Sequence, residues 1–229
     1  MNERSTPAAK GRDPKQESKE AQRHGGKAEW ARRIRVPLGF LTAALFLIEC
    51  ARRPVHPAAV AWSLALVLPG LALRAAAAGT VKKNRELATS GPYAYTRNPL
   101  YLGSALIAAG FAIALFDWPM AIVITVGFAA IYVPVIFSEE SFLRGAFANF
   151  DDYCRHVPRF LPRLTPAKMA QSKALPFESK AVTTDAPGGF SLMLYLKHRE
   201  YNATLGAALL YLSLVILHPL LQLVLRRIQ

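Results

Sequence analysis

The sequence predicts an all-α protein, a polytopic transmembrane helical bundle of about five spans with polar loops and an interfacial helix. Apolar residues make up 52% of the 229 residues, and the mean hydropathy is +0.20. They are gathered in long uncharged blocks instead of recurring at the spacing of a soluble core. The formal net charge of +13 comes from basic residues that lie almost entirely outside these blocks. These residues do not follow one aromatic-studded face, so we expect no nucleic-acid partner.

Residues 1–35 are expected to form a disordered basic tail. They contain ten Lys or Arg, five Asp or Glu and five glycines or prolines, with almost no large apolar side chain before Trp30. Such a segment cannot bury enough apolar surface to fold. It does not have the pattern of a secretory signal. Electrostatic attachment to anionic lipid is the alternative to a solvated tail.

Five apolar blocks are candidates for membrane helices, since a bilayer core needs roughly 20 apolar residues with a range of about 17–25. They are Val36 to Ala51, Val55 to Ala78, Leu100 to Phe116, Pro119 to Phe137 and Ala203 to Leu225. The first is short enough to be re-entrant or interfacial instead of spanning. Only Asp117 and Trp118 join the third to the fourth, which predicts a tight helical hairpin with Trp118 at the headgroup level.

The basic residues predict the orientation. If all five blocks span, the tail and both polar loops share one side and hold 23 of the 28 Lys and Arg, while four lie on the other side. The remaining one, Arg74, is near a helix end where it can snorkel. The positive-inside rule then places the amino terminus and both loops in the cytoplasm.

Four regions follow from this pattern. Residues 1–35 are the tail, 36–163 the membrane core, 164–202 a cytoplasmic linker, and 203–229 a C-terminal transmembrane helix. The linker is rich in Lys, Pro and Gly, and it contains a short apolar run over 190–196. We expect that run to form the interfacial helix.

The first polar loop ends where the third membrane helix begins. Gly91 and Pro92 mark a turn, and Pro99 is at a position that a helix start tolerates, so Arg97 and Asn98 flank the amino end of that helix. Free backbone N–H groups there favour an anionic group, and Arg97 adds a forked donor for a carboxylate or phosphate. The alternative is that Arg97 only anchors the helix among headgroups.

Two adjacent acids, Glu139 and Glu140, lie where the fourth helix leaves the membrane. Carboxylates at this depth cost free energy unless cations meet them, and Arg97 or a ligand ammonium could do so. The apolar residues that follow recur at helical spacing and predict a helix along the interface that starts near Glu139. They are Phe142, Leu143, Ala146, Phe147 and Phe150. Ordinary acids in the first turn of an amphipathic helix are the alternative.

Together, the two elements resemble the superfamily of integral membrane methyltransferases that contains the isoprenylcysteine carboxyl methyltransferases and phospholipid methyltransferases. The resemblance covers about residues 80 to 163 and rests on the two motifs occurring in this order around a transmembrane hairpin. The matching positions are Leu87, Gly91, Pro92, Tyr93, Arg97, Asn98, Pro99, Tyr101, Gly103, Glu139, Glu140, Leu143, Phe147, Tyr153 and Arg159.

The resemblance implies that S-adenosylmethionine binds between the two elements on the cytoplasmic side. The implied cofactor-binding residues are Arg85, Glu86, Leu87, Ala88, Tyr93, Asn98, Pro99, Leu100, Tyr101 and Glu139. The candidate catalytic residues are Arg97, Glu140 and Arg159, and either Glu139 or Glu140 could take the ammonium group. Arg159 could also be an interfacial anchor. Methyl transfer depends on in-line placement of a nucleophile. We therefore expect no metal, and the histidines show no metal-ligand spacing.

The predicted activity is methyl transfer to a lipid-like acceptor that enters from the membrane. Its reacting group is left open among a carboxylate, an amine and a thiol, as in isoprenylcysteine-like or phospholipid-like acceptors, and so is the oligomeric state. One alternative is a sterol-type NADPH reductase, because those enzymes resemble the same Arg-x-Pro-x-Tyr-x-Gly element. Another is a non-enzymatic scaffold that binds anionic lipid. The adjacent acids and the short chain favour the methyltransferase.

Overall fold

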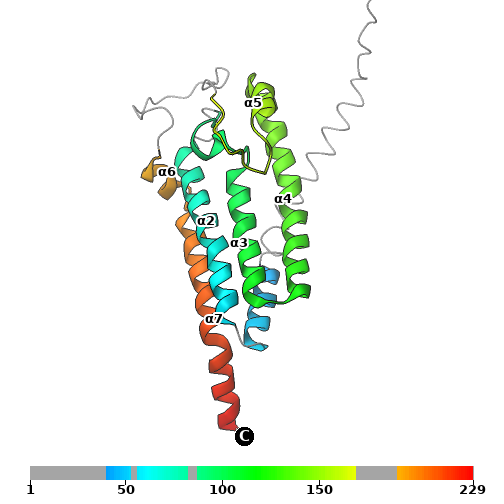
Figure 1. Ribbon diagram of the computed structural model, residues 1–229, viewed down its shortest axis with the longest axis vertical. Helices are drawn as coiled ribbons and strands as arrows, with labels where there is room; N and C mark the ends of the chain where they lie inside the picture. Colours follow the sequence, from blue (N-terminus) through cyan, green and yellow to red (C-terminus); the bar gives the residue numbers. More distant parts are fainter. Residues whose placement is uncertain (1–39, 53–55, 82–86, 169–189, 229) are drawn as a thin grey trace, which may run out of the picture.

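The computed structural model describes residues 40–52, 56–81, 87–168 and 190–228, and every regular element within these ranges is helical (Figure 1). The elements are a helical segment over 40–52, α2 (Pro57–Thr80), the 3₁₀ turn η1 (Gly91–Ala94), α3 (Pro99–Leu115), α4 (Trp118–Ala146), α5 (Phe150–His156), α6 (Leu192–Lys197) and α7 (Tyr201–Ile228). The predicted all-α class is therefore confirmed. The predicted tail of residues 1–35 lies outside the described ranges.

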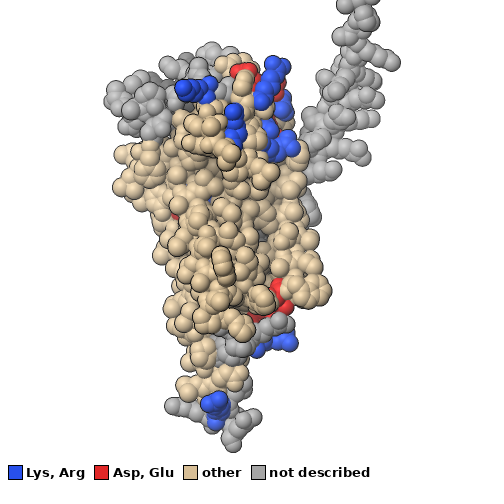
Figure 2. Space-filling view, in the orientation of Figure 1, with Lys and Arg blue, Asp and Glu red and all other residues tan. Residues whose placement is uncertain are grey.

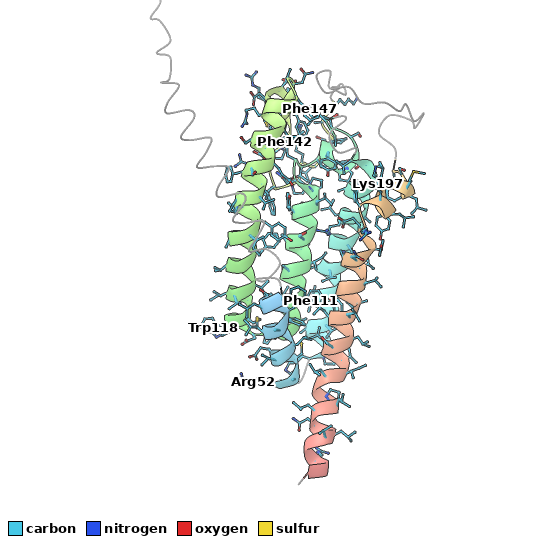
Figure 3. The ribbon with its side chains drawn as sticks, turned by 180° about the vertical axis from the view of Figure 1, so that it is seen from behind. Arg52, Phe111, Trp118, Phe142, Phe147 and Lys197 are labelled. Carbon is cyan, nitrogen blue, oxygen red and sulfur yellow. The ribbon has the colours of Figure 1, made fainter. Side chains whose placement is uncertain are left out.

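The polar loops lie at one end of a helical bundle. Helices α2, α3, α4 and α7 run along the long axis, and the segment 40–52 lies beside their lower half (Figure 1). Phe147 and Lys197 are at the upper end with α5 and α6, while Arg52 and Trp118 mark the opposite end (Figure 3). The expected common side of the two polar loops is thus seen in the structure, and its placement in the cytoplasm stays a prediction.

The surface of the bundle fits a membrane protein. Helices α2 and α4, and α7 as far as Val224, are long and apolar enough to cross a bilayer, and α3 is a shorter apolar helix of 17 residues. Trp62, Val126 and Leu209 are large apolar side chains exposed on these helices. The Lys and Arg in view gather at the two ends, with a long band almost free of them between (Figure 2). Of the first predicted span, residues 36–39 lie outside the described part of the chain.

Glycines bring α2 and α3 into close contact. A Cβ added to Gly70 would lie 2.7 Å from the backbone oxygen of Gly103, and one added to Gly103 would lie 2.7 Å from the backbone oxygen of Gly70. Lower down, a Cβ on Gly110 would collide with Val67. Gly103 and Gly110 of α3 therefore let the backbones of two helices approach closely, which is the usual role of small residues at membrane helix interfaces.

The hairpin between α3 and α4 is as tight as predicted. Helix α3 ends where Phe116 takes the left-handed conformation with φ 49°, and α4 begins two residues later at Trp118. A left-handed residue is a common way to end a helix. Trp118 is 75% exposed, and its place at the headgroup level stays a prediction.

Helix α4 corrects one expectation. The sequence predicted a span that ends at Phe137 and a separate interfacial helix after it, but α4 continues unbroken from Trp118 to Ala146. No Gly or Pro separates Val135 from Arg144, so nothing breaks the helical hydrogen bonds there. At 1.5 Å per residue its 29 residues measure about 44 Å, which exceeds a hydrocarbon core of about 30 Å. The helix therefore carries the two acids to its polar end.

Helix α6 occupies most of the apolar run that predicted a short helix. Ser191 caps its start by accepting a hydrogen bond from the Leu194 N–H. The helix docks on the end of α2, because the Ser191 N–H donates to the Gly79 carbonyl at 2.9 Å and the Phe190 ring lies where a Gly79 side chain would be. Its placement at a membrane interface stays a prediction.

Candidate functional site

The site is built on two chain segments that hydrogen bonds tie together at the polar end. The backbone N–H of Arg97 donates to the Pro158 carbonyl at 2.9 Å, and the Thr96 hydroxyl donates to the Phe160 carbonyl at 3.0 Å. The Tyr153 hydroxyl of α5 donates to the Tyr93 carbonyl at 2.8 Å. The loop before α3 and the segment around α5 therefore form one layer over the ends of the helices.

Glu140 is the centre of a buried charge cluster and is only 4% exposed. Arg159 donates from Nε to both carboxylate oxygens at 3.1 Å and from Nη2 to Oε2 at 3.0 Å. Arg97 Nη1 lies 3.4 Å from Oε1 on the other side, and Asn98 Nδ2 donates to the same oxygen at 3.3 Å. The structure thus brings the three predicted catalytic residues, Arg97, Glu140 and Arg159, into one cluster.

A cavity of about 410 Å³ lies beside this cluster, within the usual range of about 300–1,000 Å³ for small-molecule sites. All the described residues of the predicted cofactor set line it, namely Leu87, Ala88, Tyr93, Asn98, Pro99, Leu100, Tyr101 and Glu139. Arg97 and Glu140 also line it, whereas Arg159 does not, because it binds Glu140 from the other side. Arg85 and Glu86 lie outside the described residues.

The two adjacent acids face different surroundings. Glu140 is buried among guanidinium groups, whereas Glu139 is exposed and lines the cavity. Consecutive helix positions point about 100° apart, so the Glu140 carboxylate is buried between the arginines at the cavity wall while the Glu139 carboxylate is exposed in the cavity. Glu139 is therefore the acid that is available to a ligand cation.

The tyrosines beside the cavity keep their protons. Burial, together with the nearby charges of Glu139 and Glu200, raises the pKa of Tyr93 above its usual range. Burial is also the main cause that raises the pKa of Tyr153. Because a raised pKa keeps a phenol neutral at physiological pH, both side chains act as uncharged walls and hydrogen-bond groups.

The cavity offers three kinds of surface. Arg97, with a side chain 12% exposed, supplies a cation, and its Nε has no hydrogen-bond partner among the described residues. Glu139 supplies an anion, and Tyr93, Tyr101 and Phe142 supply aromatic walls. A cationic end, an anionic end and an aromatic wall together match a zwitterion with a flat ring system.

Sequence reasoning missed three residues here. Arg74 was expected to snorkel, but it lines the cavity and donates from Nη2 to Glu200 at 2.7 Å. Its isolation within an apolar block was a usable signal, because an ionisable residue inside a span is a functional candidate by default. Cys154 Sγ accepts a hydrogen bond from Arg97 Nη1 at 2.8 Å. Nothing in the sequence signalled the contacts of Cys154 or Glu200.

The central part of the chain matches a known family. The model of the family described as phospholipid methyltransferase matches residues 62–149. Residues 62–149 carry a phospholipid methyltransferase domain. The family is part of the integral membrane methyltransferase superfamily that the motifs resemble, so this expectation is confirmed. The phospholipid methyltransferase domain contains α3, α4, Arg97 and both acids, whereas Arg159, the segment 40–52 and α7 lie outside it.

Two curated relatives match part of the chain. The cobalt-zinc-cadmium resistance protein CzcN of Cupriavidus metallidurans is 39% identical over 84 residues, and the nickel-cobalt-cadmium resistance protein NccN of Alcaligenes xylosoxydans xylosoxydans is 38% identical over 84 residues. Each match covers 37% of this chain and 39% of the relative, so the chain spans well under half of their length. No solved structure matches the chain. The phospholipid methyltransferase domain supports membrane methyltransferase activity in general.

Proposed function

We propose that the chain is an S-adenosylmethionine-dependent methyltransferase that acts on a lipid-like acceptor in the membrane. The observation that carries this proposal is the cavity at the polar end of the bundle. There Arg97, Glu139 and the aromatic rings of Tyr93, Tyr101 and Phe142 meet, and all of these residues lie inside the phospholipid methyltransferase domain. The excess of basic residues at this end supports a cytoplasmic active site.

The residues present fit this cofactor. Glu139 would hold its ammonium group, Arg97 its carboxylate, and the rings of Tyr93, Tyr101 and Phe142 its adenine. Bound there, S-adenosylmethionine would supply a methyl group to a lone pair on the acceptor, as the carbon–sulfur bond breaks and leaves its electron pair on sulfur. An anionic acceptor or a tertiary amine needs no base, whereas a thiol or a primary or secondary amine would also give up a proton to a carboxylate or to water.

Glu140 has a positioning role in this proposal. Its carboxylate is fixed by Arg159 on one side and by Arg97 and Asn98 on the other. A bound anion would compete for Arg97, and the Arg159 contact keeps Glu140 in place when it does. Precise placement matters in such a reaction, because well-aligned reactants lower a barrier by as much as about 7–11 kcal/mol.

Calorimetry of the full chain in detergent with S-adenosylhomocysteine tests the proposal. We expect saturable binding that Glu139→Gln weakens by about 10- to 150-fold, because a hydrogen bond to a charged group contributes about 1.5–3 kcal/mol. Asp152→Asn is the matched control, since Asp152 is an exposed carboxylate that faces His156 on α5. It should leave the affinity unchanged.

Three outcomes would overturn the proposal. No binding of S-adenosylhomocysteine beside strong binding of NADPH would favour a reductase. If the chain binds neither S-adenosylhomocysteine nor NADPH but still binds anionic vesicles, a scaffold would be favoured. Equal losses of affinity for S-adenosylhomocysteine in Glu139→Gln and Asp152→Asn would show that the affinity depends on the overall charge of the protein and not on a contact in the cavity.

A further inference from the structure

The guanidinium of Arg159 lies on the outer surface of the bundle. Its central carbon is 4.4 Å from the centroid of the Phe137 ring, and Phe137 is 50% exposed. Neither residue lines the cavity at the polar end. Glu140 lies behind Arg159, between it and Arg97. Arg159 therefore connects the buried charge cluster to the surroundings of the protein.

Arg159 uses one edge of its guanidinium within the protein. Nε and Nη2 donate to the Glu140 carboxylate at 3.0–3.1 Å. Among the residues that the structure describes, none accepts a hydrogen bond from Nη1. A guanidinium is a planar fork with five N–H donors, so the edge formed by Nη1 and Nη2 can bind a second anion that presents two oxygens. Carboxylate and phosphate groups have this geometry.

The depth of this edge matches that of lipid headgroups. Phe137 follows Trp118 by 19 residues on α4, which is a rise of about 28 Å. A hydrocarbon core is about 30 Å thick, so Trp118 at one boundary places Phe137 close to the other. Figure 3 shows Trp118 at the lower end of the bundle and Phe142, which follows Phe137 on α4, near its upper end. Arg159, stacked on Phe137, is therefore within reach of lipid phosphates.

The loop that carries Arg159 has the composition of a membrane interface. Arg155 and Arg163 are also exposed. Leu161 and Leu164 are large apolar side chains that are exposed on either side of Arg163. Arginines that meet phosphates, beside leucines that enter the acyl region, are typical of segments at this boundary. The exposed leucines favour a bilayer over a soluble acidic partner.

Arg144 is exposed at the same end but differs in its partners and its depth. Its side chain is 52% exposed, close to the 44% of Arg159. However, Arg144 Nε donates to Asp151 at 2.7 Å, and the Phe150 ring on which it lies is buried. It also follows Phe137 by seven residues on α4, which places it about 10 Å further along the helix. Arg144 is thus a matched control for Arg159.

We infer that Arg159, stacked on Phe137, binds the phosphate of an anionic phospholipid at the outer surface of the bundle. One Nη2 hydrogen stays with Glu140, while Nη1 and the other Nη2 hydrogen face two phosphate oxygens. A zwitterionic phospholipid also has a phosphate, but its cationic group would meet the other arginines of the loop, Arg155 and Arg163. The site therefore favours a headgroup with a net negative charge.

This lipid is not the methyl acceptor, and its site does not depend on the proposed function. The bound phosphate would hold Arg159 in its present position, and Arg159 in turn holds Glu140. Glu140 is 3.4 Å from Arg97, which lines the cavity. An anionic lipid outside the bundle is thereby linked to the charge cluster inside it.

Native mass spectrometry of the full chain, released from detergent micelles, tests this inference. The micelles are titrated with dioleoyl phosphatidylglycerol or dioleoyl phosphatidylcholine, which have equal acyl chains and differ in headgroup charge. The wild type should bind phosphatidylglycerol more tightly than phosphatidylcholine. Arg159→Gln should lower the affinity for phosphatidylglycerol by about fivefold, which is the scale of one arginine at an anionic membrane surface.

Arg159→Lys separates a forked site from general positive charge. It keeps the net charge, but an ammonium group is a point charge and lacks the two edges of a guanidinium. We therefore expect it to lose nearly as much affinity for phosphatidylglycerol as Arg159→Gln, and it carries the test if Arg159→Gln does not fold. Arg144→Gln should leave this affinity unchanged. Circular dichroism checks that each variant keeps its helices.

Four outcomes would overturn the inference. Arg159→Gln could bind phosphatidylglycerol as tightly as the wild type does. Arg159→Lys could retain the full affinity, which would show that charge alone is sufficient. Arg144→Gln could lose as much affinity as Arg159→Gln, which would show that the whole polar end attracts the lipid. Displacement of the lipid by inorganic phosphate or by an oligoglutamate peptide would assign the free edge of Arg159 to a soluble anion.

Discussion

Removal of the Glu140 charge should destabilise the protein strongly, while removal of the neighbouring Glu139 charge should not. The Glu140→Gln substitution keeps the size of the side chain and an amide oxygen that Asn98 can bond. It removes the negative charge that lies between Arg97 and Arg159. The effect should come from the two cations left behind.

The magnitude follows from the exposure of the two arginines. The Arg159 side chain is 44% exposed, so water can solvate it once the ion pair is broken. The loss of the Arg159–Glu140 pair should therefore contribute only about 0–1 kcal/mol to the destabilisation. Arg97 is 12% exposed and remains a buried charge. Removing one partner of a buried pair costs about 3–5 kcal/mol, so Arg97 dominates. The total is a large part of a typical stability of about 5–15 kcal/mol.

The assay is reversible unfolding of the purified chain in mixed micelles, followed by circular dichroism. Glu139→Gln is the control and should stay within about 0.5 kcal/mol of the wild type, as exposed substitutions do. Because Glu140→Gln could fail to fold, a double variant with Arg97→Gln keeps the reasoning testable. Removal of both charges should recover stability, with a coupling energy of about 0.5–3 kcal/mol. Strictly additive effects, or Glu140→Gln as stable as the wild type, would refute the argument.

Two further predictions concern packing and pH. Gly110→Val should lower the free energy of unfolding by about 1–3 kcal/mol, because the valine side chain would collide with α2. Gly145→Val is the control, since a Cβ added to Gly145 would meet nothing within 4 Å. Equal losses of unfolding free energy in the two variants would contradict the packing argument. The raised pKa of Tyr153 means that its stabilising contribution is present below the usual phenol value near 10 and is lost as pH rises above it. Unfolding between pH 8 and 11 should therefore show a smaller alkaline loss in Tyr153→Phe than in the wild type, and identical slopes would show that Tyr153 does not contribute.

The helices could be predicted because their signals are local, and the common end of the two polar motifs could be predicted because each motif lies next to a membrane-helix boundary. Uncharged apolar blocks indicate spans, a two-residue connection indicates a hairpin, and the two polar motifs pointed to Arg97 and Glu140 meeting at one end. The structure has them 3.4 Å apart. The extent of α4 differs from the prediction, because the sequence changes from apolar to polar residues after Phe137 while the helix continues to Ala146. Such a change marks a membrane boundary, whereas a helix ends only where its hydrogen bonding is broken.

The contacts between distant segments could not be predicted in this way. Arg74 and Glu200 are 126 residues apart, and Arg97 and Cys154 are 57 apart. No periodicity connects such positions, because their proximity depends on how α7 and α5 pack against the domain.

The adjacency of the two acids explains how one helix end serves two purposes. A ligand carboxylate needs an accessible Arg97, but a buried arginine needs a permanent counter-charge, and one acid cannot both neutralise it and remain open to the cavity. Helical geometry resolves this, because consecutive residues face directions about 100° apart. Glu140 can then stay bound to Arg97 and Arg159 while Glu139 remains free to meet a ligand cation. Replacement of either acid by glutamine would therefore lose one of the two functions.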